Sequence, residues 1–182
     1  MPKLDDALRE SDLLFDRAHL ERETERIAWT IREDYTGDRP VYLTVMHGGM
    51  PFASQLALEL GGRGLDLEFD YLHASRYRGT TSGGTLHWKH RPATPLRGRR
   101  VLLVDDIVDE GHTLAQVREW VREQGASEVR IAALAVKQHN RCVSGLVADY
   151  AGLTVPDRYV YGYGMDYYEQ GRNLPAIYAL QG

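Results

Sequence analysis

The chain has 182 residues, 43% hydrophobic and 26% charged, which is typical of one globular domain with a sizeable core. Its 22 basic and 26 acidic residues give a net charge of −4, which argues against a dedicated nucleic-acid binder, because such proteins usually carry a basic surplus. Cys142 is the only cysteine, so an internal disulfide is excluded and a reducing cytoplasm is favoured. The sequence contains no signal-peptide core and no apolar run long enough to span a membrane, so we expect a cytoplasmic protein.

The first third of the chain predicts a scaffold of helices and strands. Residues 13–15 favour a short strand or a packing contact, and Asp16 is placed to cap a helix that runs to about Tyr35. Residues 41–45 predict a strand rich in β-formers, and Pro51 suits the first turn of a following helix. Two glycines between this strand and helix would let a ligand approach the backbone, although such pairs are also common in purely structural turns.

The next segments alternate between sheet and loop patterns. Residues 65–71 alternate apolar and acidic side chains, which predicts a strand with its apolar side chains on a buried face and its acidic ones on a wet face. The Gly, Ser and Thr content of residues 78–85 predicts a loop, which by composition is either a linker tip or a lid. Basic residues gather at 89–100 and could bind nucleic acid or an oligomer partner, but the prolines and glycine among them favour a solvated hairpin. Residues 177–180 predict an edge strand.

The most informative stretch is VLLVDDIVDEGHTL, residues 101–114. Its first four residues predict a strand buried on both faces, and an acidic turn and a helix start follow, which is where open α/β sheets place ligands. Amides at a helix start attract anions, whereas four carboxylates repel them. A phosphorylated sugar would offer hydroxyls to the carboxylates and a phosphate to the amides, helped by a divalent cation. A bare cation site or a solvated turn would also explain the charges. A P-loop is excluded, because Asp106 stands in place of a glycine and His112 in place of the lysine.

The strand followed by DD-x-x-D-E-G-H-T resembles the phosphoribosyl-diphosphate motif of type I phosphoribosyltransferases, and later elements resemble the hypoxanthine-guanine branch. The likeness runs from about Val41 to Leu174. It implies an α/β fold in which helices flank a central, mostly parallel sheet and the terminal segments form a small hood. We expect a single domain over residues 1–182, with a core at about 38–150 and hood or base-binding segments at about 1–15 and 151–182.

The resemblance implies roles for the central motif. Asp105 and Asp106 would accept hydrogen bonds from the ribose hydroxyls, and Asp109 would be the general base for the purine. The 5′-phosphate would bind the amides of Glu110, Gly111, His112 and Thr113, together with the Thr113 hydroxyl. Many family members have threonine where Glu110 stands, and a carboxylate would repel the phosphate. We therefore expect the Glu110 side chain to point away from it.

The resemblance also implies a pyrophosphate site and a lid. His47, Gly48 and Arg172 would contact the pyrophosphate, with a cis peptide bond between His47 and Gly48. Mg²⁺ would neutralise this leaving group, held by Asp105 and Asp106, with Asp166 acting through a water molecule. The lid would start at Ser75, Arg76 and Tyr77 and exclude water from the developing ribosyl cation.

The resemblance further implies that the purine would be recognised by Ile107 and by residues from the last third of the chain. Lys137 ends a predicted buried strand and would donate to a 6-oxo group, which favours hypoxanthine, guanine or xanthine over adenine. Ile107 and Tyr159 would pack on opposite faces of the purine. The Val160 backbone would read its N1/2 edge, close to Asp166.

We therefore expect an enzyme that transfers the phosphoribosyl group from phosphoribosyl diphosphate to hypoxanthine or guanine in purine salvage. The resemblance suggests a homodimer or homotetramer that binds neither nucleic acid nor a membrane. Two alternatives stay open. One is a phosphoribosyltransferase for xanthine or another base, and the other is a regulator that senses phosphoribosyl diphosphate and binds nucleic acid. The regulator would need a basic face or an added domain, which the charge of −4 disfavours.

Overall fold

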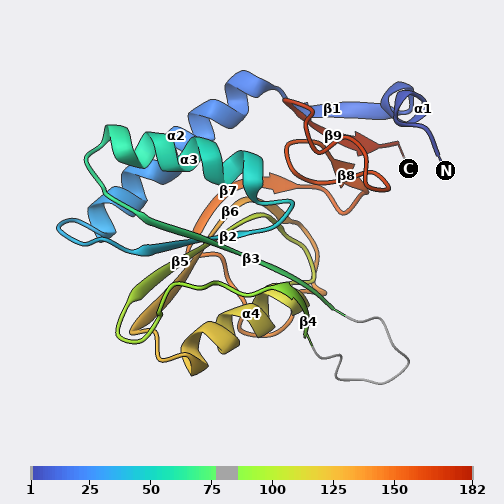
Figure 1. Cartoon of the computed structure of the whole chain (residues 1–182). Helices are drawn as coiled ribbons and strands as arrows, with labels where there is room; N and C mark the ends of the chain where they lie inside the picture. Colours follow the sequence, from blue (N-terminus) through green and yellow to red (C-terminus); the bar gives the residue numbers. More distant parts are fainter. Residues whose placement is uncertain (1, 77–85, 182) are drawn as a thin grey trace.

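The computed structural model describes residues 2–76 and 86–181 and contains two β-sheets of unequal size (Figure 1). The larger sheet has the strand order β4-β3-β2-β5-β6-β7. Its strands are β2 (Val41–Val45), β3 (Glu68–Arg76), β4 (Leu86–His90), β5 (Arg100–Val108), β6 (Glu128–Lys137) and β7 (Tyr150–Val155). Neighbouring strands are parallel except for the antiparallel pair β3–β4. This arrangement confirms the predicted fold class.

Helices cover both faces of the larger sheet (Figure 1). The helices α2 (Arg17–Asp34) and α3 (Met50–Gly62) lie on one face, and α4 (His112–Glu123) lies on the other. Successive residues of β5 therefore enter different cores: Leu102 packs with α2 and α3, whereas Leu103 packs with α4. This confirms that residues 101–104 form a strand buried on both faces. Among the helices of the described residues, none is long and apolar enough to cross a membrane.

The predicted start of the second helix is confirmed. Asp16 lies at the N-cap of α2, where its carboxylate accepts a hydrogen bond from the backbone amide of His19 at 2.9 Å. The first turn of α3 contains Pro51, as its position in the sequence predicts.

The prediction for residues 65–71 was partly wrong. Strand β3 begins only at Glu68, and although Leu65 and Leu67 are buried, Phe69 and Tyr71 are 65% and 42% exposed. The reason is tertiary: α3 packs over β2 and β5 and leaves this face of β3 uncovered. The alternation of apolar and acidic residues therefore showed which side chains share a face of β3. It did not show that the face with Phe69 and Tyr71 would lack a covering helix.

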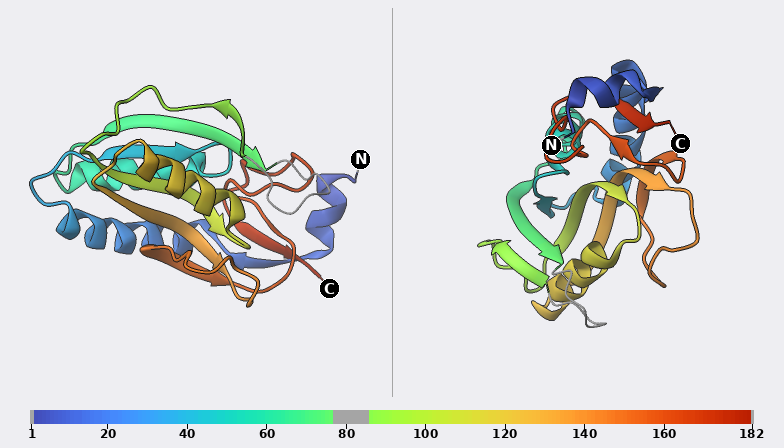
Figure 2. Two further views of the ribbon diagram at one scale, coloured as in Figure 1. Left: turned by 90° about the horizontal axis from the view of Figure 1, so that it is seen from below. Right: turned by 90° about the vertical axis from the view of Figure 1, so that its right-hand side faces the viewer.

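The smaller sheet joins the two ends of the chain at the end of the molecule toward which the parallel strands run (Figure 2). It has the order β1-β9-β8, formed by β1 (Ser11–Phe15), β9 (Ile177–Leu180) and β8 (Val160–Tyr161), and α1 (Leu4–Arg9) packs beside it. The prediction of an edge strand at residues 177–180 was wrong. The strand β9 lies in the middle, because β1 returns from the other terminus to pair with its free side.

Part of the basic segment lies at the opposite end of the larger sheet, where β3 and β6 begin. Arg99 forms an ion pair with Glu68 at 2.9 Å, and Arg100 forms ion pairs with Glu128 at 2.7 Å and Asp38 at 3.1 Å. These partly exposed pairs use both guanidinium groups for local contacts. They favour the solvated interpretation of these two arginines over a nucleic-acid surface.

Candidate active site

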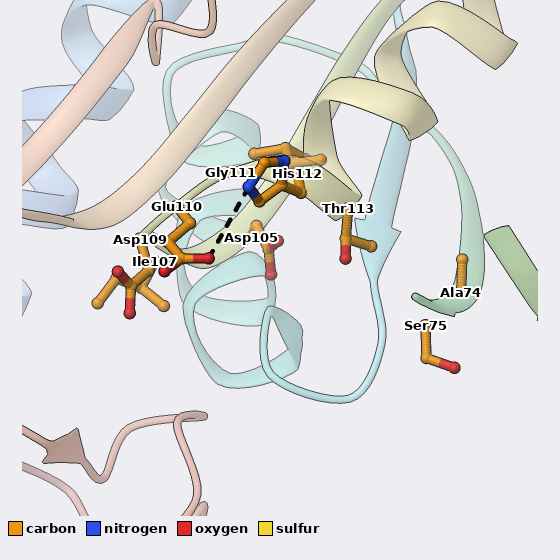
Figure 3. Close-up of a pocket in the computed structure, with 10 residues that line it drawn as sticks. Ala74, Ser75, Asp105, Ile107, Asp109, Glu110, Gly111, His112 and Thr113 are labelled. Atoms are coloured by element: carbon orange, nitrogen blue, oxygen red, sulfur yellow. Dashed lines mark ion pairs between the residues drawn. The ribbon is translucent and has the colours of Figure 1, made fainter. Parts of the chain in front are cut away.

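Two adjoining hollows lie at the carboxyl ends of the parallel strands. The larger one, of about 790 Å³, is lined by Ala74, Ser75, Asp105, Ile107, Asp109, Glu110, Gly111, His112, Thr113 and Leu114 (Figure 3). The smaller one, of about 410 Å³, is lined by Met46, His47, Gly48, His73, Ser75, Lys89, Asp105, Asp106, Glu169 and Arg172. The two hollows share Ser75 and Asp105, so they form one continuous candidate site.

The turn after β5 forms part of the wall of the larger hollow (Figure 3). Gly111 occupies the N-cap of α4 with φ 75°, a conformation that favours glycine. A Cβ atom there would lie 2.1 Å from Cδ2 of Leu146, so a larger residue would also force the Leu146 side chain to shift. The first turn of a helix leaves backbone amides without partners inside the helix. His112 and Thr113 carry such amides at the wall of the hollow, which suits the predicted phosphate site.

Asp105 and Asp106 lie where the two hollows meet. Asp106 is 8% exposed and Asp105 is half-buried, and each accepts a hydrogen bond from the next backbone amide, at 2.9 Å and 2.7 Å. Burial and the adjacent carboxylate raise the pKa of Asp105 well above its usual range, and burial also raises the pKa of Asp106. Two such carboxylates would be stabilised as anions by hydroxyl donors or by a cation.

The turn after β2 packs tightly against Asp106. A Cβ atom on Gly48 would lie 2.1 Å from Oδ2 of Asp106, so a larger residue would force the Asp106 side chain to move. The predicted cis bond between His47 and Gly48 was wrong by one position, because the cis bond joins Met46 to His47. The Met46 amide still donates to the Leu72 carbonyl at 2.8 Å, so the strand pairing continues through Met46 and the chain turns directly after it.

Two side chains hold Asp109, which lines the larger hollow. Lys137 Nζ donates to Oδ2 of Asp109 at 2.7 Å, and Nε2 of His139 lies 2.6 Å from Oδ1 of the same carboxylate. Burial favours the neutral acid, but the hydrogen bonds from Lys137 and His139 outweigh it and lower the pKa of Asp109. Lys137 and Asp109 were both predicted as site residues. His139 was missed, and its only sequence signal is its place just after the carboxyl end of β6.

The smaller hollow gathers basic side chains from distant parts of the chain. The rings of His47 and His73 meet edge to face with their centres 4.4 Å apart, and Lys89 and Arg172 line the same space. Burial and the neighbouring His47 lower the pKa of His73. His73 was not predicted as a site residue, and Lys89 was predicted only as part of the basic segment 89–100. A shift of register between β3 and β4 beside His73 accompanies the placement of Lys89, which periodicity alone does not reveal.

The Glu110 side chain lies between Arg141, outside the phosphate turn, and His112, within it. Its carboxylate lies 3.9 Å from Nε of Arg141 and 3.8 Å from Nε2 of His112, the contact marked in Figure 3. Arg141 in turn makes two hydrogen bonds, of 2.7 Å and 2.6 Å, to Asp157. The expectation that Glu110 points away from a bound phosphate stays a prediction. Arg141 is the side chain toward which the Glu110 carboxylate would then point.

Only some of the residues predicted to contact the purine line the two hollows. Ile107 lines the larger hollow, whereas Tyr159, Val160 and Asp166 are not among the described residues that line either one. The Tyr159 ring is 45% exposed and its hydroxyl donates to the backbone carbonyl of Asp166 at 3.1 Å. Val160 pairs with β9, and the Asp166 carboxylate forms an ion pair with Arg172 at 2.9 Å. Asp166 is therefore connected to the smaller hollow through Arg172.

The predicted lid falls largely outside the described residues. Ser75 and Arg76 are the last residues of β3, and Ser75 lines both hollows. Tyr77 and residues 78–85 lie outside the described residues. Within residues 2–76 and 86–181, no group of three or more His, Cys, Asp or Glu side chains is arranged to hold a metal ion.

Comparison with known proteins identifies relatives of this chain. A family model described as the phosphoribosyl transferase domain matches residues 11–156. The hypoxanthine-guanine phosphoribosyltransferase of Streptococcus pneumoniae is 37% identical over 152 residues, which cover 83% of this chain and 82% of that protein. The corresponding enzyme of Lactococcus lactis is 35% identical over 152 residues, which cover 83% of this chain and 80% of that protein.

Solved structures show the same relationship. A hypoxanthine phosphoribosyltransferase from Staphylococcus aureus superposes with a TM-score of 0.89 at 26% identity, covering 99% of this chain and 97% of that one. A hypoxanthine-guanine phosphoribosyltransferase from Bacillus anthracis gives a TM-score of 0.84 at 27% identity, covering 93% of this chain and 98% of that one. Both the sequence and the fold place this chain in the phosphoribosyl transferase family.

Proposed function

We propose that this protein transfers the 5-phosphoribosyl group from phosphoribosyl diphosphate to a 6-oxopurine, hypoxanthine or guanine, and releases pyrophosphate. The observation that carries the proposal is the pairing of Lys137 with Asp109 at 2.7 Å beside the turn at Gly111. It combines an ammonium donor for a 6-oxo group, a carboxylate for a ring N–H and a helix start for a phosphate. The names of the relatives agree with this substrate class.

Each part of the substrate has a matching part of the site. The 5′-phosphate would bind the amides of residues 110–113 and the Thr113 hydroxyl, and the ribose hydroxyls would donate to Asp105 and Asp106. The pyrophosphate would occupy the smaller hollow with His47, Gly48 and Arg172, where Lys89 adds positive charge and His73 lines the same space. The purine would lie on Ile107, with Tyr159, Val160 and Asp166 completing its pocket. Ser75, Arg76 and Tyr77 would begin the lid.

The arrangement couples recognition of the base to its activation. In the free protein, Lys137 occupies Oδ2 of Asp109 and helps to lower its pKa, which makes the carboxylate a weak base. When Lys137 donates to the purine 6-oxo group instead, Oδ2 becomes available to the ring N–H and Asp109 becomes a stronger base. A purine without the 6-oxo acceptor would leave Asp109 bound to Lys137. This is a physical reason for discrimination against adenine.

The donor chemistry of the site fits Mg²⁺. Asp105 and Asp106 are oxygen ligands whose raised pKa values reflect buried negative charge that a divalent cation would offset. They would hold the ion together with substrate oxygens, and Asp166 would act through a water molecule. When bound, Mg²⁺ would neutralise charge on the departing pyrophosphate.

The decisive test is a steady-state assay with Mg²⁺ and phosphoribosyl diphosphate against hypoxanthine, guanine, xanthine and adenine. We expect turnover with hypoxanthine, guanine or both, and at least 10²-fold lower kcat/KM with adenine, the scale expected when a buried donor is left unpaired. Turnover confined to xanthine would replace the proposed specificity. Absence of turnover with all four bases, together with binding of phosphoribosyl diphosphate and a nucleic acid, would favour the regulator.

We further propose a cytoplasmic homodimer or homotetramer whose single domain has its core at about residues 38–150 and its hood in the terminal segments. Support for self-association comes from exposed apolar side chains on α3 and β3, including Leu58 at 79% and Phe69 at 65% exposure. Light scattering coupled to size-exclusion chromatography tests the assembly, and a monomer at micromolar concentration would contradict it.

A further inference from the structure

His139 has a geometry that the proposed roles leave unused. Its side chain is only 3% exposed, and Nε2 lies 2.6 Å from Oδ1 of Asp109. Its Nδ1 atom accepts a hydrogen bond from the backbone amide of Arg141 at 3.1 Å. A neutral imidazole has one donor nitrogen and one acceptor nitrogen, so acceptance at Nδ1 assigns the ring proton to Nε2. The ring therefore donates to Asp109 without needing a charge.

We propose that His139 is a positioning residue that keeps the Asp109 carboxylate oriented while the purine exchanges places with Lys137. The inference rests on the proposed function, because it assigns Asp109 the task of accepting the purine proton. The two carboxylate oxygens have different partners: Lys137 holds Oδ2 and His139 holds Oδ1. When the purine draws Lys137 away, Asp109 loses the contact at Oδ2. Of these two contacts, the one with His139 at Oδ1 remains to hold the carboxylate.

The surroundings explain why this contact can persist during the reaction. Lys137 carries its ammonium on a flexible chain that can reorient, whereas His139 is a buried ring fixed at both nitrogens. The Arg141 backbone that fixes Nδ1 belongs to a segment anchored by the two hydrogen bonds from the Arg141 side chain to Asp157. Both anchors lie outside the two hollows, so substrate binding need not disturb them.

The test compares His139→Leu with His139→Gln. Glutamine can place an N–H near the former Nε2 position, whereas leucine fills the space without a donor. We expect His139→Leu to lower kcat about 10-fold, a fraction of what a general base contributes, with KM for phosphoribosyl diphosphate unchanged. His139→Gln should restore most of kcat. The exposed His87, changed to leucine, is the matched control, because His87 is not among the described residues that line either hollow.

A double-mutant cycle separates positioning from a general packing role. If His139 acts through Asp109, His139→Leu should cause little further loss of kcat in an Asp109→Asn background. Full additivity of the two losses, or equal damage from leucine and glutamine at position 139, would overturn the proposal.

A spectroscopic readout does not depend on turnover. Nitrogen-15 NMR of the histidine rings should show His139 as the neutral tautomer protonated at Nε2, with a shift of its Nε2 signal in Asp109→Asn. Protonation at Nδ1, or an Nε2 signal that does not respond to Asp109→Asn, would refute the inference. If these NMR results appear but the wild-type protein turns over no 6-oxopurine, the proposed function is wrong, and His139 orients Asp109 without a part in that reaction.

Discussion

Replacing Gly111 by alanine tests the phosphate turn at its most restrictive position. At φ 75° a residue with a Cβ atom costs about 1–2 kcal/mol. The new Cβ would also lie 2.1 Å from Cδ2 of Leu146, and relief of such overpacking costs about 1–3 kcal/mol. Together these terms predict a loss of about 2–5 kcal/mol in unfolding free energy, or roughly 4–20 °C in Tm for a chain of this length.

A matched control separates the two terms. Gly37 has φ 78°, but a Cβ there would meet nothing within 4 Å, so Gly37→Ala should incur only the backbone cost. Urea and thermal unfolding would measure both variants, and steady-state kinetics would measure KM for phosphoribosyl diphosphate. We expect KM to rise only for Gly111→Ala, because the displaced turn carries the phosphate-binding amides. Equal destabilisation of the two variants with an unchanged KM would refute the reasoning.

Three further predictions concern the charged groups of the site. Asp109→Asn should lower kcat on the order of 10²-fold or more at similar thermal stability, and nearly intact turnover would show that Asp109 is not the base. Lys137→Ala should raise KM for the purine, whereas a rise confined to KM for phosphoribosyl diphosphate would contradict its role. Because folding raises the pKa of Asp105, its ionisation opposes folding. Asp105→Asn should therefore raise Tm in Mg²⁺-free buffer at pH 8. This gain in Tm should shrink as the pH falls and vanish below about pH 4, where the carboxyl of Asp105 is protonated in the unfolded chain as well. A gain in Tm that does not depend on pH would show that ionisation of Asp105 is not its cause.

Much of the candidate site was predictable because its residues are close in sequence. The buried strand, the acidic turn and the helix start at residues 101–114 are local features, and local spacing placed Asp105, Asp109 and Gly111 on one wall of a hollow. The parallel arrangement of β5 and β6 follows from their apolar runs, and it brings Lys137 to the same edge of the sheet. Position at a strand end was enough to select this lysine.

Other features depended on contacts between distant segments. The sequence by itself predicted α2, α3, the buried strand β5 and the chemistry of the turn after β5, because hydrophobic period and turn composition act over a few residues. Only the tertiary structure decided which face of β3 stays uncovered, that β9 lies inside the small sheet and that the cis bond precedes His47. It alone also brought His139 to Asp109 and His73 to His47, because contacts that depend on side-chain direction across separate strands leave no periodic trace in the chain.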